Sequence, residues 1–169
     1  MKKILALATL VALLIITTIS YGQDNPTLEF RSGNYAYDYN AKEFVTNPVF
    51  SQNELVNDNY YRIIHFEQTP STRDKAELKA AGVELMAYLP TQSFYAAIET
   101  NANLDLLLSK GANAILKIES EYKLSPVLKS KEFHDWALMG DRISLKAVFH
   151  ENLSHENARL SIERVGGKY

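Results

Sequence analysis

The sequence predicts an α+β protein: a β-α-β-β-α-β module with an antiparallel sheet, followed by an incomplete second copy with one strand and one helix. Short runs of alternating β-branched and aromatic residues are typical of strands. Segments that begin at a polar capping residue and end at glycine lie between these runs and are typical of helices. The spacing of Phe66, Ser71 and Gly82 recurs, with one extra residue, at Phe149, Ser154 and Gly166.

The first half of the module is predicted to contain a strand, a helix and a second strand. Residues Tyr60–Glu67 are rich in β-branched and aromatic side chains, which favour a strand. Ser71 and Asp74 have the spacing of a capping box, so a helix should begin after this serine. The helix should end at Gly82, because glycine is favoured just beyond a helix C-terminus. Val83–Leu89 would form the second strand.

The second half is predicted to repeat the same kinds of element. Ser93–Glu99 alternates as a third strand. Asn101 or Asn103 can cap a short leucine-rich helix, and Gly111 can end it. Ala112–Ser120 is then the fourth strand. These elements together form the β-α-β-β-α-β order.

The beginning of the chain has the pattern of a bacterial secretory signal peptide. Lysines at positions 2 and 3 precede the apolar run Ile4–Ile16, and small residues precede a cut between Gly22 and Gln23. The apolar run is shorter than the ~18 residues expected of a membrane-spanning helix. We therefore expect a secreted or periplasmic protein with no stable membrane anchor after signal removal. The complete lack of cysteine agrees with a bacterial origin.

The chain is predicted to divide into five segments with different roles. Polar residues without a persistent period follow the signal, which predicts an extended arm with one short helix. The second copy would contain a strand at Ile143–His150 and a helix after Ser154. One strand and one helix bury too little to fold alone, so we expect a fragment of a longer precursor or a borrowed partner. The segments are a signal peptide at 1–22, an arm at 23–58, the module at 59–122, a linker at 123–141 and a truncated second repeat at 142–169.

Strand alternation predicts two different faces of the sheet. The face under the helices should be apolar, with Phe94 on the third strand and both Ala114 and Leu116 on the fourth. The opposite face has an aromatic and aliphatic centre, which is the composition of a protein-binding patch. Either the arm or second repeat of the same chain covers this patch, or a separate protein does. The candidate residues are Tyr61, Ile63, His65, Met86, Tyr88, Tyr95 and Ile115.

The sequence contains no pattern that indicates a catalytic, metal or cofactor site. The four histidines have no helical metal-site spacing, and there is no cysteine to join them. No glycine-rich phosphate loop and no Gly-x-Ser-x-Gly motif occurs. A net charge of −2 and a pI of about 6.1 do not favour nucleic-acid binding. We therefore expect no cofactor and a protein partner.

An ordered series of short motifs resembles a known family. The series includes the strand ending in Phe66, the turn Ala81-Gly82-Val83, the run Tyr88-Leu89-Pro90 and a closing strand leading into Tyr122-Lys123-Leu124. It resembles the N-terminal prodomain region of secreted bacterial subtilisin-like (S8) serine proteases of the Bacteroidetes type, over about residues 59–168. The resemblance implies a ferredoxin-like, inhibitor I9-like propeptide.

This resemblance implies binding to a protease rather than catalysis. Such propeptides press their open sheet face onto the subtilisin-like domain, in cis or in trans, as folding chaperone and temporary inhibitor. Tyr122 and Leu124 would belong to the tail that enters the protease cleft. The Asp, His and Ser motifs of the subtilase catalytic domain are absent, so this chain is not expected to hydrolyse peptides. The alternative is a stand-alone secreted binding or envelope module with no relation to proteases.

Overall fold

The computed structural model describes residues 26–168, and the predicted signal peptide with its cut between Gly22 and Gln23 lies outside the described residues. The described part is a mixed α+β structure with antiparallel sheets, as expected. Its strands are β1 Thr27–Phe30, β2 Gly33–Ala36, β3 Asn59–Phe66, β4 Val83–Leu89, β5 Ser93–Glu99, β6 Ala112–Lys117, β7 Leu138–Met139 and β8 Arg142–Ile143. Its helices are α2 Ala41–Thr46, α3 Thr72–Ala80, α4 Asp105–Ser109, α5 Ser120–Lys123, α6 Pro126–Ser130 and α7 His155–Arg164, with short 3-10 turns η1 Gln52–Glu54 and η2 Asp135–Ala137.

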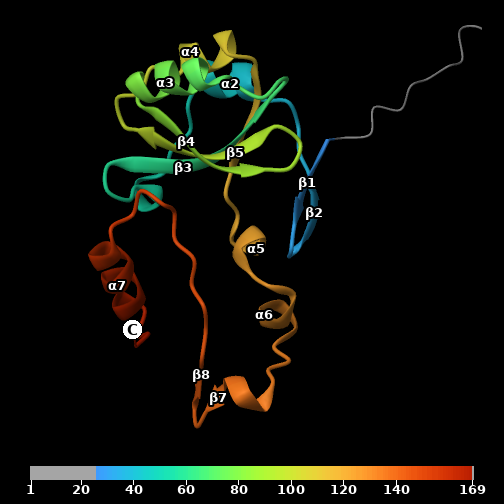
Figure 1. Cartoon of the computed structure of the whole chain (residues 1–169), viewed down its shortest axis with the longest axis vertical. Coiled ribbons are helices and arrows are strands. Elements are labelled where there is room, and N and C mark those ends of the chain that lie inside the picture. The colour runs from blue at the N-terminus through green and yellow to red at the C-terminus, as the bar shows by residue number, and fades with distance from the viewer. Residues whose placement is uncertain (1–25, 169) are drawn as a thin grey trace, which may run out of the picture.

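The main sheet has four antiparallel strands in the order β4-β5-β3-β6. Along the chain, the elements from β3 to β6 follow the predicted order β-α-β-β-α-β. Helices α2, α3 and α4 lie in a row over one face of this sheet (Figure 1). The strand boundaries agree with the predicted ones to within one to three residues.

Helix α3 begins and ends where the sequence predicts. The Ser71 backbone N–H donates to the Asp74 carboxylate (3.1 Å), and the Asp74 N–H donates to the Ser71 hydroxyl (3.2 Å). Gly82 follows the helix with a φ of +85°, a conformation that side chains disfavour. A Cβ at this position would also lie 3.0 Å from the Ala102 Cα. The glycine is thus required by both conformation and space.

The principal hydrophobic core lies between the three helices and the sheet. Ile64 and Phe66 of β3, with Phe94 of β5, point into it and are almost fully buried. Leu78 of α3 and Leu107 of α4 fill it from the helix side with no exposed surface. At about 1.5–3 kcal/mol for each large apolar side chain removed from water, this layer is the main source of stability.

The segment predicted as an extended arm, residues 23–58, contains the short helix that was expected, but its described residues also form a hairpin that was not expected. Strands β1 and β2 pair as an antiparallel hairpin, and α2 packs beside β6. Leu28, Tyr37 and Ala41 are buried. Each strand has four residues, so its alternation is too short to stand out in the sequence. These elements acquire their conformation by packing on the module.

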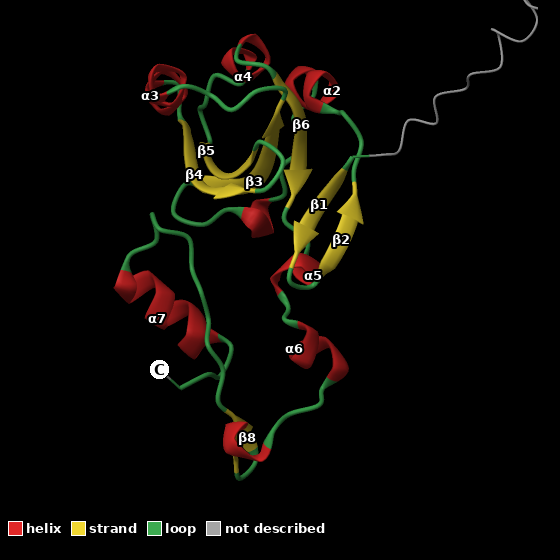
Figure 2. Ribbon diagram, turned by 45° about the vertical axis from the view of Figure 1, so that its right-hand side comes forward, coloured by secondary structure: helices red, strands yellow, loops and turns green. Residues whose placement is uncertain are grey.

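The predicted strand at Ile143–His150 is also wrong. Ile143 is the only residue of this range in a strand; it and Arg142 form β8, which pairs with the two residues of β7. Residues 144–150 have no strand partner among the described residues. The chain leaves the sheet through α5 and α6, turns at the β7-β8 hairpin and returns to the sheet (Figure 2). The predicted linker at 123–141 therefore contains short elements. The predicted helix after Ser154 is confirmed as α7, with the Ser154 hydroxyl accepting from the Asn157 N–H at 3.2 Å.

A candidate binding face on the sheet

The sheet face opposite the helices, called here the second face, is apolar at its centre. Ile63 of β3 and Ala114 of β6 are fully buried there, and Ile118 is nearly so. Tyr61 and Tyr95 lie beside them and are half-buried. The prediction of an aromatic and aliphatic second face is thus supported by the positions of three of its residues: Tyr61, Ile63 and Tyr95.

The β1-β2 hairpin and the segment after it cover one half of the second face. Leu28 and Tyr37 pack into the same cluster as Ile63. The ring of Tyr37 lies 5.5 Å from that of His65, whose Nδ1 is 2.5 Å from the Asn113 Oδ1. Burial raises the pKa of Tyr37 to about 12. His65 is therefore buried between Tyr37 and Asn113, and its side chain is not accessible to a partner protein.

Residues 146–152, called here the covering segment, lie over the other half. The His150 ring stacks on Tyr61 at 4.4 Å with an interplanar angle of 8° and meets the Tyr95 ring edge-on at 5.4 Å. The Tyr61 hydroxyl donates to the Asn152 Oδ1 at 3.0 Å. Burial lowers the pKa of His150, and the Lys123 ammonium lowers it further. The neutral imidazole is therefore the form that this contact favours.

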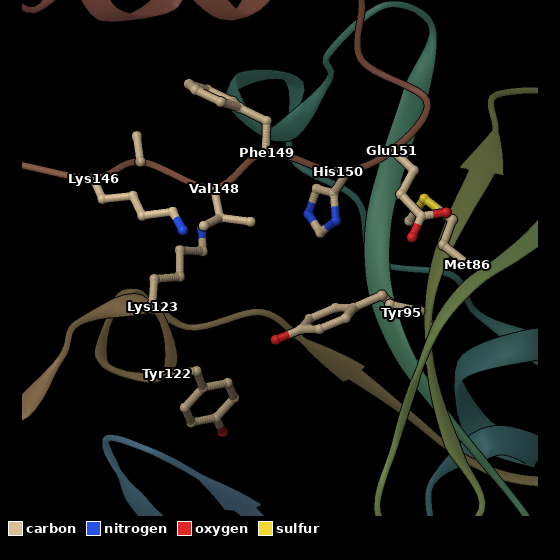
Figure 3. Close-up of a pocket in the computed structure, with 11 residues that line it drawn as sticks. Met86, Tyr95, Tyr122, Lys123, Lys146, Val148, Phe149, His150 and Glu151 are labelled. Carbon is tan, nitrogen blue, oxygen red and sulfur yellow. The ribbon is translucent and has the colours of Figure 1, made fainter.

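A cavity of about 590 Å³ remains between the covering segment and strands β4 and β5. Met86 and Tyr95 form its wall on the sheet, and His150 and Val148 close it from the covering segment (Figure 3). Tyr122 lines it from below the sheet. This volume is in the range of small-ligand sites. The incomplete filling indicates that the covering segment contacts the face through a few side chains rather than through a packed interface.

Two of the predicted face residues lie on the helix side instead. Ile115 pairs with Ile64 and joins the principal core, because β6 alternates with the opposite phase from that expected. A bulge between Leu85 and Tyr88 changes the phase of β4, so Tyr88 pairs with Phe94 and its ring lies 5.2 Å from that ring. Each of these strands has apolar residues in both phases, so the hydrophobic pattern did not decide which phase faces the helices.

The predicted tail residues differ from each other in their surroundings. The Tyr122 ring stacks on Phe30 at 5.0 Å and lies 4.4 Å from Tyr35, so the β1-β2 hairpin holds it. The Lys129 ammonium, which donates to the Tyr35 hydroxyl at 2.6 Å, lowers the pKa of that phenol. Leu124 is 41% exposed and is the freer of the two tail residues.

Two polar clusters of the module were not identified in the sequence. The Glu54 carboxylate accepts from the buried Arg62 at 2.6 Å and pairs with Lys117 at 2.7 Å. The hydrogen bond from Lys117, and to a smaller extent that from Arg62, lowers the pKa of Glu54 to about 2. The Asn40 side-chain amide bonds both the N–H and the C=O of Ile115, at 2.8 Å and 3.1 Å, and so pairs the outer edge of β6. No short-range signal links Asn40 to Ile115 or Glu54 to Lys117, because these partners lie more than sixty residues apart in the chain.

In residues 26–168, no group of three histidine, cysteine or acidic side chains is arranged to hold a metal ion. Within the same range, no helix is both long and apolar enough to cross a membrane. The second face offers aromatic rings, an exposed rim and a cavity, which suit recognition of an extended peptide or a protein surface.

Comparison with known proteins gives one match. No curated protein and no solved structure matches the chain. Residues 29–119 match the model of a domain of unknown function, DUF8729. The matched range runs from the middle of β1 to just beyond β6, so most of the β1-β2 hairpin lies inside the family unit together with the four-stranded sheet. Because this match spans more than half of the chain, the chain belongs to the DUF8729 family.

Proposed function

We propose that this chain is an exported protein-binding module that docks a subtilisin-like serine protease domain on its second face and acts as its chaperone or inhibitor. The partner is either joined in cis or supplied in trans. Export is supported by the charged and apolar pattern at the N-terminus, and the choice of partner by the sequence resemblance over residues 59–168. The proposed role is binding, with hydrolysis belonging to the partner.

The order of strands supports a ferredoxin-like arrangement of the module. In that arrangement, the first and third strands lie in the middle and the second and fourth at the edges. Strands β3 and β5 occupy the middle of the sheet here, and β4 and β6 its edges. The helices then cover one face, and the partner would bind on the other, where the covering segment lies over one half.

The observation that carries the proposal is that the second face already holds an extended piece of chain. The covering segment has no strand partner among the described residues and is fixed there through His150 and Asn152. Two ring contacts and one neutral hydrogen bond contribute about 2–4 kcal/mol together. A protein that binds with a micromolar dissociation constant gains roughly 8 kcal/mol, so such a partner can displace this segment.

An inhibition assay tests the proposal directly. The purified chain should slow the hydrolysis of a peptide substrate by a subtilisin. Tyr95→Asp, on the second face, should weaken this inhibition by about tenfold or more, because an unpaired charge would be buried. Tyr88→Asp is the matched control, since Tyr88 lies on the adjacent strand but on the opposite face and is 56% exposed. Met86→Glu, at the cavity wall, provides a second test if Tyr95→Asp does not fold.

A second function is favoured by the coverage of the face. Because the hairpin and the covering segment both pack on it, the chain could be a self-contained envelope or structural module. This alternative predicts that Tyr95→Asp lowers the free energy of unfolding by a few kcal/mol. It also predicts that the folded wild type does not inhibit a subtilisin at micromolar concentration. That pair of results would overturn the protease proposal.

A further inference from the structure

A second cavity, of about 520 Å³, lies away from the sheet, in the part of the chain that follows α5. Helix α6, the turn η2 and the returning strand β8 with the residues after it surround it. Its walls are largely apolar and aromatic. The wall residues that matter here are Val127, Leu128, Phe133, Trp136, Ile143 and Leu145.

The charges around this second cavity all have the same sign. Arg31, Lys123 and Lys146 line it, and no carboxylate among the described residues does. None of these three cations forms an ion pair within residues 26–168. Figure 3, which draws the first cavity, shows the side chains of Lys123 and Lys146 extending toward each other from α5 and from the covering segment; both lysines line the first cavity as well as the second. Cations that converge without a counter-charge repel, and a bound anion would relieve that repulsion.

We propose that this cavity binds a small amphipathic anion, a monocarboxylate with a hydrocarbon body of medium-chain fatty-acid size. The carboxylate would lie between Lys123, Lys146 and Arg31, where hydrogen bonds to charged donors are strongest. The hydrocarbon body would cover Trp136 and Leu145, which are 80% and 63% exposed. The volume suits a small ligand, and apolar walls with a few charged groups are typical of such sites. The inference does not depend on the proposed protease partner.

Trp136 makes the site directly observable, because it is the only tryptophan in the chain. Decanoate added to the purified protein should shift the tryptophan emission to shorter wavelength in a saturable way, since the hydrocarbon replaces water around the indole. Decanol has the apolar body without the charge, and acetate has the charge without the body. Each should bind at least about tenfold more weakly than decanoate.

Variants of the basic residues distinguish binding at a defined site from non-specific binding to the protein surface. The double variant Lys123→Gln and Lys146→Gln should weaken decanoate binding about tenfold or more, and Arg31→Gln should weaken it in the same direction. Lys42→Gln, an exposed lysine on α2, is the matched control and should bind as the wild type does. Circular dichroism checks that each variant is folded.

Four results would overturn the proposal. These are no saturable shift with decanoate, equal binding of decanol, an unchanged affinity in the folded double variant, and a shift with a glutamate-rich peptide but not with decanoate. The last result would identify an acidic protein partner in place of a small molecule. Inhibition of a subtilisin is unaffected by any of these outcomes, so the two proposals can fail separately.

Discussion

The complete unit, residues 59–117, and its partial copy, residues 143–166, share capping and glycine positions but reach different structures. Ser71 and Ser154 each accept a hydrogen bond from an N–H three residues on, and Gly82 and Gly166 both have φ near +80°. Strand β3, however, pairs with β5 on one side and β6 on the other. Its counterpart at 144–150 pairs with no strand among the described residues.

This difference separates what local sequence decides from what packing decides. A helix satisfies its backbone hydrogen bonds internally, so capping residues alone can set where α7 begins and ends. A strand needs neighbours for its N–H and C=O groups. Within residues 26–168 no strand pairs with residues 144–150, and these residues pack instead through His150 on the second face.

The largest expected difference between the units is in the cost of removing a buried leucine. Leu78→Ala in α3 should lower the free energy of unfolding by about 3 kcal/mol or more, because Leu78 has no exposed surface. Leu160→Ala in α7 is the matched control; Leu160 is 43% exposed, and the cost should be below about 1 kcal/mol. Urea unfolding measures both. Equal costs would contradict the claim that only the complete unit has its own core.

The next difference concerns acid sensitivity. Glu54→Gln should cost about 2–3 kcal/mol near neutral pH, since it leaves the buried Arg62 without its carboxylate. The pKa of Glu54 falls from 4.5 to about 2 on folding, so the carboxylate stabilises the fold fully above about pH 4.5. That contribution is lost as the pH falls toward 2, and the gap between wild type and variant should close over this range.

The exposed ion pairs of α7 provide a control for the pH dependence of stability expected at Glu54. The Glu156 carboxylate accepts from the Arg159 guanidinium at 2.7 Å, and neither side chain is buried. Glu156→Gln should leave the unfolding midpoint unchanged at every pH, because exposed pairs contribute little. A pH-independent gap for Glu54→Gln would show that its carboxylate does not stabilise the module electrostatically.

The smallest difference should appear at the two helix-ending glycines. Gly82→Ala combines a left-handed conformation with a Cβ that would lie 3.0 Å from the Ala102 Cα, so we expect a loss of about 1–2 kcal/mol. Gly166→Ala has the same backbone conformation but nothing within 4 Å of the added Cβ. It should cost no more than about 1 kcal/mol. Thermal unfolding measures the loss of stability in both variants. A larger loss for Gly166→Ala than for Gly82→Ala would contradict this prediction.

Most of the module could be predicted from sequence, because its signals are local. The capping box of Ser71, the glycine at position 82 and the alternation of β5 each act within a few residues. The phases of β4 and β6 could not be predicted, since one bulge lies between Leu85 and Tyr88 and another irregularity between His65 and Phe66. Because β4 and β6 have apolar residues in both phases, the hydrophobic pattern does not show where a bulge changes the phase.

The candidate site was predicted only in part for the same reason. Tyr61, Ile63 and Tyr95 lie on the second face as alternation predicts. His150 and Asn152 complete it from about ninety residues away in the chain, and no spacing rule connects them to β3. Their only signal was the predicted apolar patch itself, which required some cover.

The proposed function requires that the second face bind a protease domain once the covering segment is displaced. The most direct measurement is the inhibition constant of the purified chain against a subtilisin, compared with that of His150→Ala. The variant removes both ring contacts with Tyr61 and Tyr95, so it should release the segment and inhibit several-fold more strongly than the wild type. If wild type and variant are both folded and neither inhibits, the claim is wrong.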